Sequence, residues 1–233
     1  MNIVITGASS GIGFEVAFQL AASGHQVFAI ARNRVKLEAL LKKTKSKNQG
    51  ASLHVIAGDI SRAESIGEIT NGIKQKADQI DILINNAGSL INKPFESLTN
   101  DDWKSMYDTN VFGTVNLIRA TLPFLTEGAH ILNISSMGGF QGSAKFKGLS
   151  GYSSGKAAIA CLTECLAEEF KDRKIAVNCL CLGSVSTEMF ALAFPNSQAA
   201  TGPDDMASFI ISFAFDGHRH FNGKILPVSI STP

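Results

Sequence analysis

The sequence predicts an α/β fold built on a doubly wound sheet of about seven mostly parallel strands, with helices on both faces. Short apolar runs alternate with helical patterns along all 233 residues, which is the order of a parallel sheet with helical crossovers. Most of these runs are continuously apolar, as strands covered on both faces are. A glycine-rich segment also joins the first run to the first helical pattern.

The expected elements follow one another without an internal repeat, a low-complexity segment or a linker. We therefore expect one domain over residues 1–233, with a short substrate loop near 187–203. The expected strands are Ile3–Thr6, Gln26–Ala31, Ser52–Ala57, Ile82–Asn85, His130–Ser135, Ala176–Leu180 and Lys224–Val228. The expected helices lie near 11–23, 34–47, 62–78, 99–126, 152–172 and 203–215.

Composition excludes several classes of protein. Hydrophobic residues make up 45% of the chain and charged residues 18%, so a large core can form. The net charge is +1, without the basic surface that nucleic acids or anionic membranes require. The longest apolar stretches fall far below the roughly 18 residues of a membrane span. With no secretory signal pattern at the start, a cytoplasmic protein is expected.

Four cysteines form two closely spaced pairs, Cys161 with Cys165 and Cys179 with Cys181, inside apolar segments. Neither pair has the two-residue spacing of a zinc knuckle. We expect buried, reduced thiols and no metal site.

The first expected strand runs into a glycine-rich turn at residues 6–13, with the sequence TGASSGIG. Glycines at such a junction let the backbone approach a pyrophosphate, which the free N–H groups and the helix dipole then bind. The same residues could serve a plain turn with a helix cap. Their place after the first strand favours a dinucleotide site in a Rossmann-type sheet. The expected contacts are Gly7, Ser9, Ser10, Gly11, Ile12 and Gly13.

The second expected strand ends at Ala31 and is followed by Arg32. Sheets that bind NAD usually place a carboxylate about 20 residues beyond the last glycine, where it holds the ribose 2′-hydroxyl. Counting from Gly13 reaches Ala31 and Arg32 instead. A guanidinium can bind a 2′-phosphate in bidentate fashion, whereas the plainer interpretation is a solvated arginine at a strand end. We therefore expect NADP(H) to be preferred over NAD(H), with Arg32 as a contact.

Tyr152 and Lys156 are four residues apart and share one face of the helix expected over 152–172. A phenol ionises near pH 10. A nearby ammonium favours the phenolate, so Lys156 is expected to lower the pKa of Tyr152 toward neutrality. The alternative is an exposed pair at a helix start.

Three further residues carry polar groups near the expected site. Ser135 and Ser136 end the fifth strand, at the sheet edge where open parallel sheets bind ligands. A hydroxyl there can donate to a developing oxyanion, or it can cap a turn. Asn110 lies within the helical pattern 99–126, where asparagine is a poor helix former. Its amide either holds a water or satisfies a local backbone group.

Together these residues resemble the short-chain dehydrogenase/reductase family, in its compact single-domain branch. The resemblance covers nearly the whole chain and every element is in family order. It rests on the glycine turn, Asp59, Asn85-Asn86-Ala87-Gly88, Asn110, Ser136, Tyr152, Lys156 and Gly183-x-Val185-x-Thr187.

The resemblance implies a role for each matched position. Tyr152 would donate a proton to a carbonyl, and Ser136, which precedes a short glycine turn, would hold the same oxygen. Lys156 would bind the nicotinamide ribose, and Asn110 would anchor a water in the proton relay. The remaining implied cofactor contacts are Asp59 and Ile60 on the adenine side, Asn85, Asn86, Ala87 and Gly88 on the ribose side, and Val185 and Thr187 at the carboxamide.

The chain departs from the family pattern in three places. Leu182-Gly183 stands where the family usually has Pro-Gly, which is expected to relax the loop without removing a reactive group. Tyr152 lies 16 positions after Ser136, a spacing a few residues longer than in many members. We expect residues 140–149 to reshape the substrate mouth. The short segment after Thr187 implies a small lid.

The expected function is an NADPH-dependent oxidoreductase that reduces a carbonyl to an alcohol by reversible hydride transfer. A 3-oxoacyl-[acyl-carrier-protein] reductase is a narrower alternative, although Thr126-Glu127-Gly128 offers no positive charge for an acidic carrier. A non-catalytic dinucleotide-sensing protein is an alternative of another class. A nucleotide-sugar epimerase is disfavoured by the chain length and the glycine spacing. Phenylalanines at 140, 146, 190 and 194 line an apolar substrate mouth or belong to the core.

The chain is also expected to form a homo-oligomer, a tetramer or a dimer. Residues 157–162 are six consecutive apolar positions, so they cover every side of their helix. A helix that covers a sheet on one side should have a polar outer face. Trp103, Tyr107, Val111 and Val115 form a second apolar face on the pattern 99–126. The alternative is deeper burial within the monomer.

Overall fold

The computed structural model describes residues 1–230, which contain a seven-stranded sheet with the order β3-β2-β1-β4-β5-β6-β7. Every neighbouring pair is parallel, as the sequence predicts. The chain leaves β1 in one direction and returns beside it as β4, and open sheets bind ligands at such a switch point. The strands are β1 (Asn2–Thr6), β2 (Gln26–Ala31), β3 (Leu53–Ala57), β4 (Ile80–Asn85), β5 (Leu125–Ser136), β6 (Ala176–Leu182) and β7 (Ile225–Val228).

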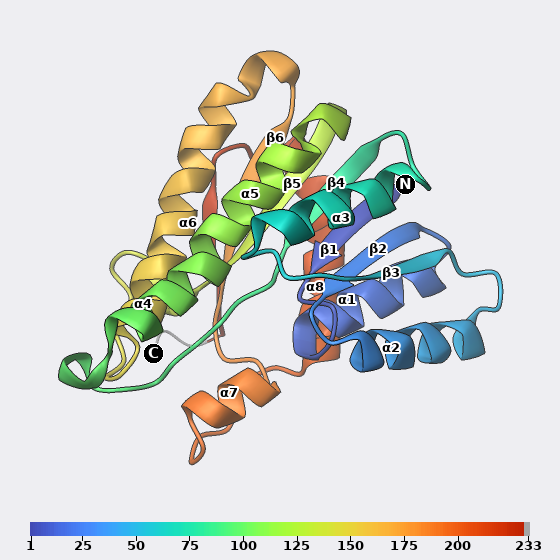
Figure 1. The fold of residues 1–233 in the computed structure, drawn as a ribbon. Coiled ribbons are helices and arrows are strands. Elements are labelled where there is room, and N and C mark those ends of the chain that lie inside the picture. The colour runs from blue at the N-terminus through green and yellow to red at the C-terminus, as the bar shows by residue number, and fades with distance from the viewer. Residues whose placement is uncertain (231–233) are drawn as a thin grey trace.

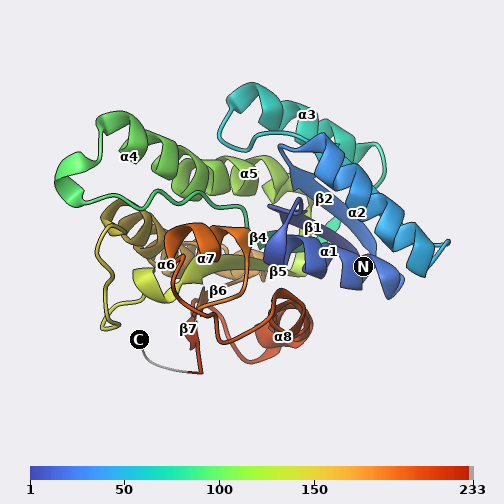
Figure 2. The same cartoon turned by 90° about the horizontal axis from the view of Figure 1, so that it is seen from below.

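Helices cover both faces of this sheet (Figure 1 and Figure 2). The first face carries α1 (Gly11–Ala22), α2 (Arg34–Lys47) and α8 (Pro203–Asp216). The second carries α3 (Ala63–Lys74), α4 (Asn100–Tyr107), α5 (Gly113–Thr121) and α6 (Ser150–Glu169). A short helix, α7 (Glu188–Ala193), lies in the segment between β6 and α8.

The strands divide their side chains between two cores. Ile3 and Ile5 of β1 belong to the core beneath α1, α2 and α8, whereas Val4 belongs to the core beneath α3 and α5. Successive side chains of a strand point to opposite faces, so a strand with both faces covered must be apolar at every position.

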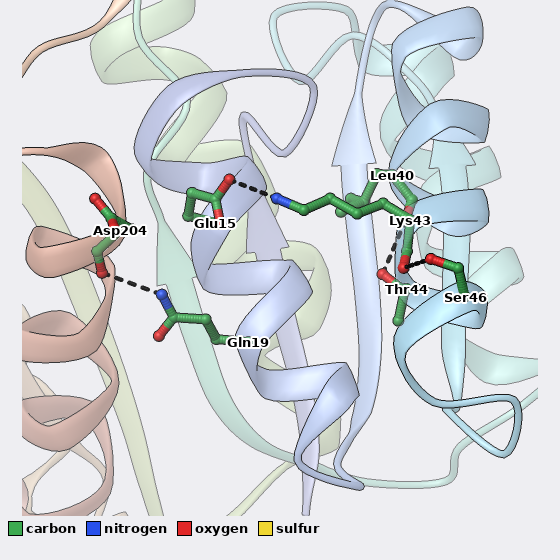
Figure 3. A network of polar contacts seen from close by, with 7 residues as sticks. All are labelled: Glu15, Gln19, Leu40, Lys43, Thr44, Ser46 and Asp204. Carbon is green, nitrogen blue, oxygen red and sulfur yellow. Dashed lines mark hydrogen bonds and ion pairs between the residues drawn. The ribbon is translucent and has the colours of Figure 1, made fainter.

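Helix α1 is held between α2 and α8 by polar contacts (Figure 3). Lys43 Nζ of α2 lies 2.9 Å from Glu15 Oε1 of α1 and 4.2 Å from the centre of the Phe18 ring. On the other side, Gln19 Nε2 donates to the Asp204 carbonyl of α8 at 3.1 Å. Exposed ion pairs contribute only about 0–1 kcal/mol. These contacts therefore serve mainly to orient α1, whose first turn follows the glycine segment.

The helix expected near 99–126 is confirmed as far as Thr121 and is wrong beyond it. Helix α4 passes through a π-helical turn at Asp108–Phe112 into α5, which ends at Thr121. A single 3₁₀ turn follows, and β5 begins at Leu125, five residues before the expected start at His130. Pro123 accounts for the early end, because its ring and missing N–H do not fit a helix interior.

The expectation of four buried cysteines is half wrong. Cys179 and Cys181 are buried in β6, but Cys161 and Cys165 are exposed on the outer face of α6. The six apolar residues at 157–162 surround the helix, and only one of its sides packs on the sheet. Within residues 1–230 no three His, Cys, Asp or Glu side chains gather as a metal site would require. No helix of this same range has the length and apolar character needed to cross a bilayer.

A histidine lies in the core between β5 and α8. His130 is fully buried; its Nδ1 lies 2.9 Å from the Ala214 carbonyl, and its Nε2 accepts from Asn178 Nδ2 at 3.1 Å. One donor and one acceptor correspond to the neutral ring. Burial lowers the pKa of His130 to about 4, and the Ala214 bond offsets only part of this effect.

We expect the free energy of unfolding to fall between pH 7 and pH 5. The pKa of His130 rises from about 4 in the folded chain to 6.5 on unfolding, so the unfolded state binds more protons in this window. The free energy of unfolding should therefore decrease by about 2 kcal/mol from pH 7 to pH 5. Urea unfolding at both pH values measures the change. Most of it should persist in His54→Gln, a change at a half-buried histidine of β3. Equal stability at pH 7 and pH 5 would contradict the assignment.

Candidate active site

The glycine turn between β1 and α1 folds tightly against its surroundings. Gly7 and Gly11 have φ angles of 72° and 56°, which favour glycine. A Cβ on Gly13 would overlap both the Gly7 carbonyl oxygen and the Asn86 side chain. The Ser10 side chain makes no cap bond to α1, so the N–H groups of its first turn lack that partner. The turn therefore offers an anion the cradle that the sequence predicts.

The segment after β4 connects this turn to the predicted catalytic residues. Thr6 Oγ1 accepts from the two backbone N–H groups that follow β4, at 3.1 and 3.0 Å, and Asn86 Nδ2 donates to the Thr6 carbonyl at 3.0 Å. A Cβ on Gly88 would lie 3.3 Å from Asn110 Oδ1 and 3.4 Å from Lys156 Nζ. Residues 86–88 therefore lie between the glycine turn and the predicted proton-transfer residues.

Asn85 does not lie where the resemblance implied. Its Nδ2 donates to Asn133 Oδ1 of β5 at 2.9 Å, and Asn133 Nδ2 donates to Thr163 Oγ1 of α6 at the same distance. All three side chains are buried. Because successive strand residues face opposite sides, Asn85 points into the α6 side of the sheet. It ties β4 to α6 and leaves the ribose side to residues 86–88.

Arg32 and Asp59 lie close together at the ends of β2 and β3. Burial raises the pKa of Asp59, but two bonds from Ser61, with the charges of Arg32 and Arg62, outweigh it and hold the pKa below its usual value. Asp59 Oδ1 accepts from Ser61 N at 3.0 Å and from Ser61 Oγ at 2.7 Å. Arg32 is exposed and makes no hydrogen bond or ion pair within residues 1–230. Its donors are therefore free to bind a phosphate.

Ser136, not Ser135, is the serine beside the tyrosine. The Ser136 and Tyr152 hydroxyls share a hydrogen bond, and Ser136 Oγ also accepts from Gly138 N at 3.1 Å. Ser135 is buried and donates to the Lys156 carbonyl at 2.8 Å, where it joins β5 to α6. The structure therefore brings together Ser136, Tyr152 and Lys156 as expected.

The electrostatics of the Tyr152–Lys156 pair differ from the sequence argument. Burial lowers the pKa of Lys156 to about 8. Its Nζ donates to the Ile134 carbonyl at 2.9 Å and lies 5.9 Å from the centre of the Tyr152 ring. Burial also raises the pKa of Tyr152, and the hydrogen bond with Ser136, which lowers this pKa, offsets only part of the effect. The expected lowering by Lys156 is wrong here, because desolvation of the phenolate dominates.

A raised pKa has a chemical consequence for Tyr152. The phenol stays protonated at neutral pH, and this is the form that can donate a proton to a carbonyl oxygen. The hydrogen bond with Ser136 places a second hydroxyl where the same oxygen would lie. The pair is therefore arranged for proton delivery to an oxyanion.

Asn110 lies in the π-helical turn, buried against the segment after β4. Its Oδ1 accepts from Ser89 N at 2.7 Å, and its Nδ2 donates to the Ser89 carbonyl at 2.8 Å. The Asn110 amide therefore satisfies a backbone group, which is one of the two roles that the sequence left open. The π-turn aims the amide away from the regular helix register. The water implied by the family resemblance stays a prediction.

The segment after β6 closes against the glycine turn. A Cβ on Gly11 would lie 3.0 Å from Thr187 Cγ2, and Thr187 Oγ1 caps α7 by accepting from Phe190 N at 3.2 Å. Val185 is buried and forms an isolated bridge with Thr201. Strand β6 continues to Leu182, two residues past its expected end, since leucine can pair in the sheet where proline cannot.

Residues 145–149 line a cavity of about 660 Å³ beside the first turn of α6. Phe146 of this segment meets Phe194 at 5.3 Å between ring centres, and Phe194 meets Phe190 at 5.3 Å. Ser153 also lines the cavity. The longer gap before Tyr152 signalled the segment 140–149, but nothing in the sequence marked Ser153 or Ser89. Their importance comes from contacts with residues distant along the chain.

Comparisons with known proteins agree with this geometry. A family model described as short chain dehydrogenase matches residues 1–198. An uncharacterised oxidoreductase of Staphylococcus aureus is 30% identical over 221 residues, which are 94% of this chain and 92% of that protein. A dehydrogenase/reductase from Sinorhizobium meliloti has a TM-score of 0.86 at 26% identity, over 97% of this chain and 92% of that one. A short chain dehydrogenase from Burkholderia cenocepacia, in complex with NADP, has a TM-score of 0.88 at 26% identity, over 97% and 95% of the two chains.

Proposed function

The chain belongs to the short-chain dehydrogenase/reductase family, whose members are oxidoreductases acting on CH–OH groups, and on that premise we propose that it reduces a carbonyl to an alcohol with NADPH. The observation that carries the proposal is the placement of three side chains: the Tyr152 phenol shares a hydrogen bond with Ser136 and lies one turn of α6 before the buried Lys156. The substrate is a small molecule. The domain boundaries, the cytoplasmic location and the narrower acyl-carrier-protein alternative stay predictions.

The residues present fit a dinucleotide. The glycine turn has no room for a Cβ at Gly7 or Gly13, and the first turn of α1 has no side-chain cap. Gly88 keeps open the space between Asn110 and Lys156. When bound, the nicotinamide supplies a hydride to the carbonyl carbon. The predicted holding residues are the glycine turn, Asp59, Ile60, residues 86–88, Val185 and Thr187.

The chain's own residues handle the proton. Ser136 orients the carbonyl oxygen, and Tyr152 donates its proton to that oxygen as negative charge develops there. Lys156 keeps a positive charge behind the phenol, and Asn110 positions the loop that carries Gly88. A catalytic role fits this arrangement better than dinucleotide sensing alone, because sensing requires no protonated phenol.

Preference for NADP(H) over NAD(H) is supported by Arg32, whose guanidinium is exposed and makes no hydrogen bond or ion pair within the described residues. Asp59, whose charge interacts with that of Arg32, already accepts two hydrogen bonds from Ser61. A free guanidinium beside an occupied carboxylate suits a phosphate better than a hydroxyl. The complex of the Burkholderia cenocepacia relative with NADP is consistent with this preference.

A carbonyl panel tests the proposed function. Purified protein is mixed with NADPH and with 3-oxoacyl thioesters, steroids, quinones or small ketones, and loss of NADPH absorbance is followed. Carbonyl-dependent oxidation of NADPH is expected with at least one class. Absence of turnover across the panel, with binding of NADPH intact, would favour the dinucleotide-sensing alternative.

The pH profile of reduction should reflect Lys156. Its pKa of about 8 means that the ammonium is present at pH 7 and is lost as the pH rises through 8, whereas the raised pKa of Tyr152 keeps the proton donor in place. We expect kcat/KM to be flat around neutrality and to fall by up to about tenfold per unit above pH 8. Initial rates from pH 6 to pH 10 measure it, and a rate that rises throughout this range would contradict the role.

The outer faces of α4, α5 and α6 support assembly into a homo-oligomer, as a dimer or a tetramer. Ala157, Cys161 and Cys165 are exposed on α6, and Phe112 in the adjoining π-turn is 54% exposed. Small and apolar side chains on a free helix face favour close packing of a second copy.

Ala157→Glu should dissociate this oligomer, because a carboxylate would be buried without a partner. Light scattering at micromolar concentration should give at least twice the 24.8 kDa chain mass for the wild type and a smaller mass for the variant. Gln49→Glu, which adds the same charge on an exposed loop beyond α2, should leave the mass unchanged. A wild-type monomer would refute the assembly.

A further inference from the structure

The cavity beside α6 has walls of two kinds. Three segments enclose it: the one after β4, residues 145–149 and the first turn of α6. Phe95 and Phe146 supply an apolar wall and are 70% and 38% exposed. Ser150 and Ser153 supply polar groups from α6. The cavity volume of about 660 Å³ suits a small molecule with an apolar body and a polar end.

Ser153, which lines this cavity, also lies near Ser136 of the proposed proton-transfer residues. A Cβ on Gly138 would lie 2.9 Å from Ser153 Oγ and 3.5 Å from Ser136 Oγ. Both hydroxyl oxygens are therefore close to the position that a Cβ of residue 138 would occupy, and Gly138 leaves this position empty. A substrate whose carbonyl is held by Ser136 can place atoms a few bonds away against Ser153.

Two hydroxyl groups in the cavity wall lack partners. The oxygens of Ser150 and Ser153 are buried and make no hydrogen bond with any described residue. Buried polar groups without a partner are rare in proteins, because each is unfavourable by about 1–3 kcal/mol. Both hydroxyls can donate, so an acceptor on a ligand would satisfy them.

The charges around the cavity favour an anion. Lys145 Nζ donates to the Phe140 carbonyl at 2.6 Å and to Ser143 Oγ at 2.7 Å, which leaves one of its three protons. Lys147 makes no hydrogen bond or ion pair within residues 1–230. Glu96 is the acidic residue among the lining side chains, so the two lysines exceed it in charge. The positive end of the 20-residue helix α6 acts in the same sense.

We propose that the substrate is an oxocarboxylate: a carbonyl compound that carries a carboxylate on an apolar body. Ser153, Lys145 and Lys147 bind the carboxylate, Phe95 and Phe146 cover the apolar body, and Tyr152 and Ser136 hold the carbonyl. The inference rests on the proposed carbonyl reduction and narrows its substrate class. Lys145, Phe146 and Lys147 all come from the segment 140–149, which is a few residues longer than in many family members.

Matched acids and esters test this inference. The probes are 4-acetylbenzoate and 5-oxohexanoate, each compared with its methyl ester, with NADPH as reductant. We expect kcat/KM for each acid to exceed that for its ester by at least about tenfold, the scale of one charge-assisted hydrogen bond. The difference should lie mainly in KM, because the carboxylate binds alike in the ground and transition states.

Variants of the two lysines and of Ser153 test which residues cause the preference for the acid over its ester. Lys147→Met alone, and together with Lys145→Met, should bring the acid-to-ester ratio toward one and leave ester turnover unchanged. Lys147→Arg should retain the ratio, because it keeps the charge. Ser153→Ala should raise KM for the acid only. Lys42→Met, at an exposed lysine of α2, is the matched control and should change nothing.

Titration calorimetry of the acids separates this inference from the proposed function. Binding of an acid and not of its ester, lost in the double lysine variant, supports the carboxylate site even if no carbonyl is reduced. An acid-to-ester ratio of one or less in turnover overturns the inference while leaving carbonyl reduction intact. Absence of acid binding to the wild-type chain overturns it as well.

Discussion

Tyr152→Phe is expected to lower kcat/KM for carbonyl reduction by about 10²–10⁴-fold, the range that positioned acid catalysis supplies. The phenol is the group that hydrogen-bonds Ser136, and its raised pKa keeps it protonated at neutral pH. Phenylalanine keeps the ring packing and removes the proton donor alone. Initial-rate kinetics with NADPH and the best carbonyl of the panel measure the loss.

Binding of the cofactor and the other tyrosine provide the controls. NADPH affinity should be nearly unchanged in Tyr152→Phe, because the phenol is not the main anchor, whereas Lys156→Ala should weaken both turnover and affinity. Tyr107→Phe removes the only other phenol, which lies on α4 with its ring 6.2 Å from that of Trp103. It should retain wild-type turnover. Retention of a tenth of the activity in Tyr152→Phe would show that Tyr152 is not the proton donor.

Arg32→Ala is expected to erase most of the preference for NADPH over NADH. The guanidinium stands at the end of β2 with its donors unpaired within residues 1–230. Loss of a charge-assisted contact with a phosphate should cost about 1.5–3 kcal/mol, or roughly ten- to a hundredfold in kcat/KM with NADPH. Efficiency with NADH should change little.

Arg34→Ala is the matched control, because Arg34 lies two residues further on and pairs with Glu38 at 3.2 Å. Its NADPH-to-NADH ratio should equal that of the wild type. Equal use of both cofactors by the wild-type chain would show that Arg32 does not select the phosphate. The same rates at several salt concentrations should show the preference weakening, because exposed charges are screened.

The deviations from the sequence predictions have local physical causes. The sequence predicts too long a helix over 99–126 because apolar periodicity continues through Leu122 and Leu125, although Pro123 interrupts it. Residue type alone predicts that Cys161 and Cys165 are buried. Their exposure depends instead on which side of α6 meets the sheet. The spacing of Tyr152 and Lys156 predicts a neighbouring charge but not burial, and burial is what raises the pKa of Tyr152.

The sequence alone determined the parallel sheet, the glycine turn and the family resemblance, because buried strands are continuous apolar runs and the motif residues adjoin strand ends. Only the tertiary structure decided which side chains meet there. It placed Ser136 and not Ser135 beside Tyr152, turned Asn85 toward Asn133, and put Ser153 next to a cavity formed with Phe95 and Lys145. These outcomes depend on which face of the sheet each strand residue meets, on the rotation of α6 about its axis and on the contacts between loops far apart in the chain. No local pattern of residues determines these three features.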